Sequence, residues 1–292
     1  MDGILIINKP QGRTSHDIVA KVKKIVNNKV GHTGTLDPNA TGVLPLLIGK
    51  GTLCSQYLME HDKIYEAVLK LGIKTDTADS EGNIIEEKEV ALSELSDENV
   101  AMVLNGFIGK QEQMPPMYSA IKVNGKKLYE YARKGQTVEI KPRQIEIYKC
   151  ELKNINLEEK EICFTVHCSK GTYIRSLCED IATKLNTVGY MKNLNRTKVG
   201  RFDISNSITV EELEANFESQ TFMNEHFITI EKLFEDKEAI TIPENRLKHF
   251  INGVKLTFKL EDGLYRIYNE ENKFIGVGSV QNNLLKREIV IE

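Results

Sequence analysis

The sequence of 292 residues predicts an α+β protein with a mixed or antiparallel central sheet, flanking helices and a small β-rich module at the C-terminal end. Three observations predict this class. Residues 64–72 and 161–168 alternate between apolar and polar side chains, as half-buried strands do. Apolar residues recur at helical spacing in other segments. The last 55 residues, 238–292, change to short strands separated by turns.

The N-terminal elements follow from local signals. Residues 3–7 are an apolar run that predicts a short buried strand, and residues 9–12 are turn formers. Thr14 or Ser15 can then cap a helix. The apolar face of that helix has the spacing i, i+4, i+7, i+8, and it comprises Ile18, Val22, Ile25 and Val26. A glycine-rich loop over 31–42 follows the helix.

The middle of the chain alternates strands and helices. After the strand 64–72, residues 73–90 are polar and acidic, and they contain a turn at 80–83. Residues 93–104 predict a helix that begins near Ser93 or Ser96. The sequence Met-Pro-Pro-Met at 114–117 then interrupts regular structure, and a basic stretch rich in tyrosine follows it.

The strand 161–168 leads through a turn at 169–172 into another predicted helix. Its inward apolar residues are Ile174, Leu177, Cys178, Ile181 and Leu185. The acidic segment 205–240 is typical of surface helices that end at a domain boundary, so we expect a large domain over 1–237 and an appended module over 238–292.

Short strands and hairpin turns dominate the expected C-terminal module. The turns Glu261-Asp262-Gly263 and Asn282-Asn283 are typical of hairpins. The predicted strands cover 254–258, 263–268, 274–280 and 288–291.

Targeting signals are absent from the sequence. Neither an apolar run of roughly 7–15 residues behind a basic start, nor one of about 20 residues that could span a membrane, occurs in it. The number of cysteines, five, is odd. We therefore expect a cytoplasmic protein with reduced thiols and no membrane contact.

Charge is strongly segregated along the chain. The net charge of −3 argues at first against a nucleic-acid partner. However, residues 1–50 carry a net charge of +4, and 110–149 and 168–201 carry +5 each, whereas 81–100 carries −6 and 205–240 carries −7. Such runs are usually solvated faces. If the basic segments share one face, they form a phosphate-binding surface on an acidic protein.

The glycine-rich loop 31–42 is the densest candidate for chemistry. Pro38 restricts the backbone of Asp37, and flanking glycines allow close approach of a ligand. A carboxylate held in this way can act as a nucleophile or a base. The alternative is an Asx turn in which Asp37 bonds its own backbone. No Gly-Lys-Ser/Thr sequence closes the loop, so it is not a P-loop.

Two further residues could complete a site. Tyr65 lies at the start of a strand, where an ordinary amphipathic role is the alternative. Arg175 lies in the first turn of a helix, and a cation there opposes the helix dipole, which suggests a specific partner or else a surface role. The spacing of structural zinc ligands is absent, and so is a dinucleotide fingerprint. We therefore expect no metal.

Several motifs resemble the TruB family of bacterial tRNA pseudouridine-55 synthases. The first is 8–15, Asn-Lys-Pro-Gln-Gly-Arg-Thr-Ser, and the loop 31–44 matches the family's catalytic motif along its whole length. The remaining matches, in chain order, are Lys63-Ile64-Tyr65, Gly72 with 75–77, 115–120, 128–133 and 168–177. The likeness runs from residue 3 to about 202 and implies the pseudouridine synthase fold, while the C-terminal module resembles a PUA-type RNA-binding domain.

The resemblance implies a role for each matching residue. Asp37 is the catalytic aspartate, paired with Arg175, and Tyr65 stacks on a flipped uracil. Whether Asp37 attacks the sugar, attacks the base or promotes elimination is left open. The implied substrate-binding residues are His32, which fills the space left by the base, Leu194 as an apolar wall, Lys9, which mainly braces the loop, and Gly34, Thr35, Tyr173 and Arg196. At Asn195 the family pattern implies arginine, so we expect this chain to bind one phosphate fewer there.

The implied activity is isomerisation of a uridine in the TΨC loop of tRNA, at position 55, after base flipping. The resemblance implies recognition of the T-arm and elbow of tRNA, an RNA-contacting insertion over about 110–149, no cofactor, no obligate protein partner and a monomer. Two other classes fit the same surface: a non-catalytic protein that binds or folds RNA, and a synthase that works inside a guide-RNA complex.

Overall fold

The computed structural model describes residues 1–59, 61–119, 121–136 and 138–291. Ala120 of the motif 115–120 lies outside these residues, as do Glu60, Thr137 and Glu292. The strands of the large sheet are β1 (Gly3–Lys9), β2 (Val30–His32), β3 (Thr41–Ile48), β4 (Lys63–Leu71), β7 (Gly109–Gln113), β10 (Arg143–Asn156), β11 (Glu161–Cys168), β12 (Gly189–Val199), β13 (Phe202–Asp203) and β14 (Phe227–Thr229).

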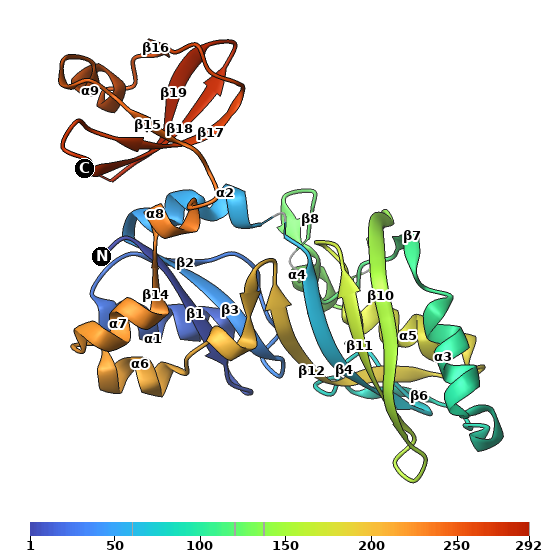
Figure 1. The fold of residues 1–292 in the computed structure, drawn as a ribbon. Helices are drawn as coiled ribbons and strands as arrows, with labels where there is room; N and C mark the ends of the chain where they lie inside the picture. Colours follow the sequence, from blue (N-terminus) through green and yellow to red (C-terminus); the bar gives the residue numbers. More distant parts are fainter. Residues whose placement is uncertain (60, 120, 137, 292) are drawn as a thin grey trace.

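These strands form one central sheet with the order β14-β1-β3-β12-β4-β11-β10-β7 (Figure 1). Strand β2 pairs with β3, and β13 pairs with β12. The neighbours along this order are antiparallel except β12 and β3, which run parallel. The sheet is therefore mixed and mainly antiparallel, as the sequence predicts.

Helices cover the sheet in separate groups. The helices are α1 (Ser15–Val26), α2 (Ser55–Leu58), α3 (Asp97–Asn105), α4 (Leu128–Ala132), α5 (Ile174–Lys184), α6 (Val210–Asn216), α7 (Gln220–His226), α8 (Ile230–Leu233) and α9 (Glu244–Ile251). Helices α3 and α5 pack against β4, β10 and β11 in one apolar core, and α1 and α6 pack against β1 and β3 in another. Two small hairpins, β5 (Ile73–Thr75) with β6 (Ile84–Glu87) and β8 (Lys122–Val123) with β9 (Lys126–Lys127), stand outside the sheet.

Short-range signals in the sequence, such as helix caps, predicted most of these elements. Helix α1 begins after Thr14, whose hydroxyl accepts from the Asp17 amide at 3.1 Å, while the Asp17 carboxylate accepts from the Thr14 amide at 2.9 Å. This capping box satisfies two amides that the helix itself leaves unpaired. Helix α3 begins after Ser96, one of the two caps expected from the sequence.

Three long strands, β3, β10 and β12, had no counterpart in the sequence prediction. Strand β3 has a nearly continuous apolar sequence, so it lacks the alternation of a typical strand, and Pro45 in its middle has no amide donor. Strand β12 is rich in polar side chains that are more typical of a loop. Both lie inside the sheet, where partners from distant segments determine strand formation.

The C-terminal segment forms its own five-stranded sheet. The strands are β15 (Ala239–Thr241), β16 (Leu256–Thr257), β17 (Gly263–Tyr268), β18 (Phe274–Gln281) and β19 (Leu284–Val290). The prediction is confirmed for 263–268 and 274–280. It is wrong at the ends: 254–258 contains only the short β16, and β19 begins before residue 288. Asn282 and Asn283 have φ of 52° and 61°, as a tight hairpin turn between β18 and β19 requires.

The C-terminal module is packed on the rest of the chain as well as linked to it. One apolar cluster combines residues of β1, α2 and α8 with residues of β17, β18 and β19. At its edge the Tyr57 hydroxyl donates to Glu288 at 3.3 Å, and the Tyr268 hydroxyl donates to Glu231 at 2.7 Å. The expectation of a merely appended module therefore understated this packing.

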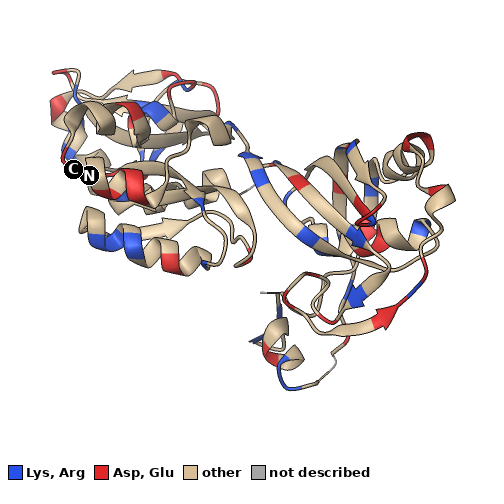
Figure 2. Cartoon of the chain, turned by 90° about the horizontal axis from the view of Figure 1, so that it is seen from below, with Lys and Arg blue, Asp and Glu red and all other residues tan. Residues whose placement is uncertain are grey.

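Charged residues of both signs are interleaved along the central strands, and acidic positions gather on β6 (Figure 2). In the described part of the chain, no helix is long and apolar enough to cross a membrane. Within that same part, no group of three or more histidine, cysteine, aspartate or glutamate side chains is arranged to hold a metal ion. All five cysteines have free thiols.

Candidate active site

Asp37 lies in the loop 33–40 between β2 and β3, which we call the aspartate loop. Backbone and hydroxyl contacts tie this loop to the start of α1. The Leu36 amide donates to the Ser15 hydroxyl at 2.8 Å, and this hydroxyl donates back to the Leu36 carbonyl at 3.0 Å. The Gly12 amide donates to the Pro38 carbonyl at 3.0 Å. The loop is therefore held from outside, and its aspartate side chain is free to face a pocket.

Lys9 holds the same loop from the interior of the protein. Its ammonium donates to the carbonyls of Pro10 at 2.8 Å, Arg13 at 2.6 Å and Pro38 at 2.9 Å, and the residue is fully buried. Burial lowers the pKa of Lys9 to about 8, against the opposing effect of the Asp37 carboxylate. All three donor positions are used inside the protein, so Lys9 braces the loop.

Arg175, in the first turn of α5, is the partner of Asp37. Its Nε lies 3.1 Å from Asp37 Oδ2, and Nη2 lies 3.5 Å from Oδ1. The same guanidinium donates to the carbonyls of Thr77 at 3.3 Å and Tyr118 at 3.0 Å. These contacts hold Asp37 by a planar fork, and none of the hydrogen bonds described for its side chain is the Asx-turn bond that the alternative interpretation requires.

Asp79 is a member of this cluster that the sequence did not single out. Its Oδ2 lies 3.5 Å from Nη1 of Arg175, on the side away from Asp37. The Thr77 hydroxyl donates to Asp79 Oδ1 at 2.6 Å, and the Glu81 amide donates to the same oxygen at 3.1 Å. Asp79 belongs to the acidic segment 73–90, and only its position just after the motif 75–77 distinguishes it from its acidic neighbours.

Burial and charge act against each other at Asp37. Burial raises the pKa of the carboxyl above its ordinary value, and the Asp79 charge adds to this effect. Arg175 and Lys9 lower the pKa. About 37% of the side chain of Asp37 remains exposed, against 7% for Arg175. The carboxylate is therefore much more exposed than its counterion.

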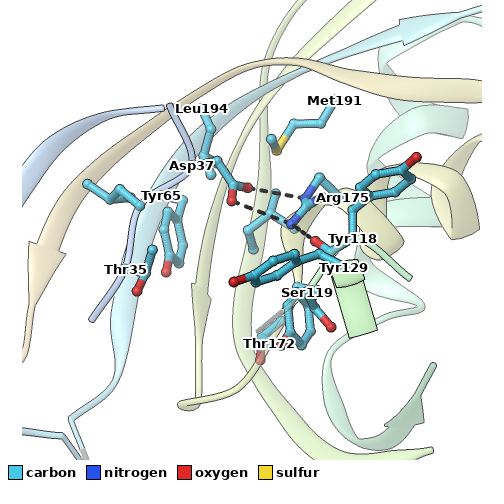
Figure 3. Close-up of a pocket in the computed structure, with 13 residues that line it drawn as sticks. Thr35, Asp37, Tyr65, Tyr118, Ser119, Tyr129, Thr172, Arg175, Met191 and Leu194 are labelled. Atoms are coloured by element: carbon cyan, nitrogen blue, oxygen red, sulfur yellow. Dashed lines mark hydrogen bonds and ion pairs between the residues drawn. The ribbon is translucent and has the colours of Figure 1, made fainter. Parts of the chain in front are cut away.

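A pocket of about 420 Å³ opens beside this pair, which is within the usual range for small-ligand sites. Figure 3 shows Tyr65 on one side of the pocket and Tyr118 and Tyr129 on the opposite side. Of the predicted site residues, the pocket contains Thr35, Asp37, Tyr65, Tyr173, Arg175 and Leu194. The lining residues that were not predicted are Leu36, Tyr118, Ser119, Tyr129, Thr172, Ile174 and Met191.

The expected insertion 110–149 contributes the far wall of the pocket. Two cations contact the Tyr129 ring, with Lys127 Nζ 5.3 Å and the Arg133 guanidinium carbon 5.2 Å from its centroid. Tyr118 reaches the pocket from the segment that precedes β8, and its carbonyl contacts Arg175. The insertion is thus directly connected to the Asp37–Arg175 pair.

His32, Gly34 and Arg196 lie behind the pocket lining. His32 is half-buried on β2, and burial together with Arg196 lowers its pKa, so its imidazole is neutral at pH 7. Arg196 is 2% exposed and donates to the Gly34 carbonyl at 3.1 Å. The side chain of Arg196 therefore points into the protein, and its expected contact with RNA stays a prediction.

Gly42 makes the junction between the aspartate loop and β12 possible. It has φ of +103°, and a Cβ added there would lie 2.2 Å from the carbonyl oxygen of Arg196. The neighbouring Asn195 accepts a hydrogen bond from the Thr41 hydroxyl at 3.1 Å. In this chain Asn195 thus binds the end of the loop, at the position where the family resemblance implies arginine.

Comparison with known proteins agrees with this architecture. Residues 22–174 match the family described as TruB family pseudouridylate synthase (N terminal domain). Residues 175–252 match the tRNA pseudouridylate synthase B C-terminal domain, and 239–290 match Pseudouridine synthase II TruB, C-terminal.

Two curated relatives named tRNA pseudouridine synthase B illustrate the similarity. The protein of Clostridium kluyveri is 45% identical over 285 residues, which is 95% of each chain. The protein of Caldanaerobacter subterraneus subsp. tengcongensis is 43% identical over 290 residues, which is 98% of each chain.

Solved structures show the same fold. An H/ACA RNP bound to a substrate RNA containing 2′-deoxyuridine holds a chain that is 23% identical with a TM-score of 0.70, over 99% of this chain and 85% of the other. A Cbf5-Nop10-Gar1 complex gives 25% identity and a TM-score of 0.69, over 96% and 78%. With the full-length relatives and the matched domains, these findings lead to one conclusion. The chain belongs to the TruB family of pseudouridylate synthases.

Proposed function

We propose that this enzyme converts a specific uridine in the TΨC loop of tRNA, at position 55, to pseudouridine. The observation that carries this proposal is the accessible Asp37 carboxylate, which Arg175 holds beside a pocket with tyrosines on opposite sides. The curated relatives are named as tRNA pseudouridine synthases, which supports tRNA as the substrate.

The reaction replaces one bond to C1′ of the ribose with another. The C1′–N1 bond breaks, the uracil turns within the pocket, and a C1′–C5 bond forms, while C5 loses a proton and N1 gains one. Breaking the glycosidic bond builds positive charge on the sugar, which a carboxylate can stabilise or trap. A single carboxylate suits an isomerase, because the enzyme must keep the uracil and exclude water.

We assign Asp37 as this carboxylate and Arg175 as the group that keeps it ionised and oriented. Tyr65 stacks on the flipped uracil from one side of the pocket, and Leu194 with Met191 forms an apolar wall. Extraction of the base from the RNA stack is required before any of these groups can reach it. His32 then fills the space that the base leaves.

The remaining parts of the chain bind the RNA. We propose a catalytic domain over 1–237, in which the insertion 110–149 grips the T-arm and the tRNA elbow, and a PUA-like RNA-binding module over 238–292. The enzyme acts in the cytoplasm as a monomer, without an obligate protein partner. Its contacts with phosphates come from the segments 1–50, 110–149 and 168–201, which have net positive charge.

The test is a tritium-release assay on the purified chain. Unmodified tRNA transcript carrying tritium at uracil C5 is incubated with the protein alone, and a second transcript has cytidine in place of uridine 55. We expect the first transcript to release one tritium per tRNA and the second to release none attributable to position 55. Tight binding without release favours an RNA-folding protein, and release only with added guide RNA and partner proteins favours a complex-dependent synthase.

A further inference from the structure

Arg196 is the largest fully buried side chain in the described part of the chain, and the proposed chemistry does not use it. It lies on β12 where three strands meet. Across the antiparallel β4 its register partner is Tyr65, and across the parallel β3 its partner is Gly42. The register of β12 against β4 shifts directly after Arg196, and a bulge of this kind redirects side chains.

The guanidinium connects both ends of the aspartate loop. Nη2 donates to the carbonyl of Gly34, near the start of the loop, at 3.1 Å. Nε donates to the carbonyl of Val43, just after its end, at 2.8 Å. The guanidinium also neighbours the Tyr65 hydroxyl, and its charge acts to lower the pKa of that phenol against the rise caused by burial. One side chain therefore contacts the loop that carries Asp37 and the tyrosine that lines the same pocket.

The charge of Arg196 has no counterion. No carboxylate in the described residues lies within ion-pair distance of it, and its ionisable neighbours Lys9 and His32 are basic groups that offer no negative charge. Burying an unpaired charge costs several kcal/mol, so a packed apolar residue would be more favourable for stability alone. An apolar residue, however, could not hold the carbonyls of Gly34 and Val43 together with the Tyr65 hydroxyl.

We propose that Arg196 is a positioning residue that fixes Tyr65 and the aspartate loop to each other, so that the ring of Tyr65 and the carboxylate of Asp37 keep one relative placement in the pocket. Arg196 acts through these groups and does not contact RNA. This inference rests on the proposed function, and it names how two parts of the same site are coupled.

The test compares Arg196→Lys with Lys153→Met, a control at an exposed position of β10 that lies outside the segments proposed to contact phosphates. Lysine keeps the charge, but its single ammonium cannot span the Val43 and Gly34 carbonyls that the separate Nε and Nη2 of arginine reach. For Arg196→Lys we expect a fall in kcat of about 10–100-fold, since small misplacements have effects of this size. The Kd for tRNA and the dependence of log Kd on log salt concentration are expected to stay unchanged. In Arg196→Gln, which removes the charge, a salt slope reduced by about 0.7–0.9 with unchanged kcat would instead show that Arg196 binds a phosphate and overturn the proposal.

A double-mutant cycle tests the link through Tyr65. Tyr65→Phe keeps the ring and removes the hydroxyl, and we expect Arg196→Lys to reduce kcat much less in that background than in the wild type. Equal fold-reductions in both backgrounds would overturn the coupling. The same four proteins are compared by urea unfolding, where we expect the changes in the unfolding midpoint to be non-additive. This result does not depend on activity, so failure of the proposed function can be distinguished from failure of the coupling. If Arg196→Lys does not fold, Arg196→Gln takes its place in the cycle. A wild-type kcat for the single variant Tyr65→Phe would by itself overturn the proposal.

Discussion

Nε of Arg175 lies 3.1 Å from Oδ2 of Asp37, although 138 positions separate the two residues in the chain. This contact accounts for an arginine in the first turn of α5, where the helix dipole disfavours a cation. Asp37 pairs with Nε of this guanidinium, and Asp79 lies 3.5 Å from its Nη1. The two carboxylates thus offset the unfavourable position of the cation at this helix end.

Replacement of Asp37 by asparagine is expected to abolish catalysis while the RNA affinity is retained. The amide keeps the size of the side chain but has no charge with which to stabilise the sugar. We expect tritium release to fall by more than ~10³-fold, with a Kd for tRNA close to that of the wild type. Filter binding and tritium release on the same preparations measure both quantities. Asp236→Asn, at an exposed site, is the matched control, and normal product from Asp37→Asn would refute the assignment.

Arg175→Lys is expected to impair the reaction even though it conserves charge. A lysine offers one ammonium, whereas Arg175 contacts Asp37, Asp79 and the carbonyls of Thr77 and Tyr118 simultaneously. We expect a reduction in kcat of about 10²-fold, because Asp37 is no longer held in one orientation. Single-turnover rates with enzyme in excess check this value. An unchanged rate would show that the fork geometry has no role.

The pH dependence of the reaction should report the environment of Asp37. Burial raises its pKa above the ordinary value of 3.8, and Arg175 counteracts this rise. If the ionised carboxylate is the active form, the rate falls as the pH decreases through this raised pKa. Removal of the positive charge in Arg175→Met moves the acid limb to higher pH. Single-turnover rates of both enzymes at decreasing pH measure the limb, and a limb that stays in place would argue that another group titrates.

Local signals explain which elements the sequence could predict. Helix α1 and strand β4 were predicted because a cap and regular spacing are visible within a few residues. Strand β12 was not, since its polar residues become a strand only between β3 and β4, which come from other parts of the chain. For the site, the family motifs pointed to Asp37 and Arg175, but Asp79 and the inward direction of Arg196 depend on contacts between distant segments.

Neutralising the basic insertion is expected to weaken tRNA binding in a salt-dependent way. Lys122, Lys126 and Lys134 are exposed side chains of the segment 110–149. In the triple variant with glutamine at these positions, we expect a higher Kd. The slope of log Kd against log salt is expected to be shallower by about 0.7–0.9 for each phosphate that the variant no longer binds.

The matched control for this variant replaces three exposed lysines outside the basic segments, Lys88, Lys153 and Lys160, with glutamine. Both triple variants change the net charge equally. If both weaken binding to the same extent, the effect comes from net charge alone, and the insertion does not bind RNA specifically.

Gly42→Ala tests the junction that places the aspartate loop. A Cβ at Gly42 would meet the carbonyl oxygen of Arg196 at 2.2 Å, and φ of +103° is itself unfavourable for alanine. Gly12→Ala separates these two effects, because Gly12 has φ of +77° but nothing within 4 Å of its Cβ position. We expect Gly12→Ala to cost about 1–2 kcal/mol in the free energy of unfolding. Gly42→Ala is expected to cost clearly more, because β3 and β12 must separate. Urea unfolding of both variants measures the difference, and equal losses would mean that backbone conformation, not the close approach of the two strands, selects glycine at residue 42.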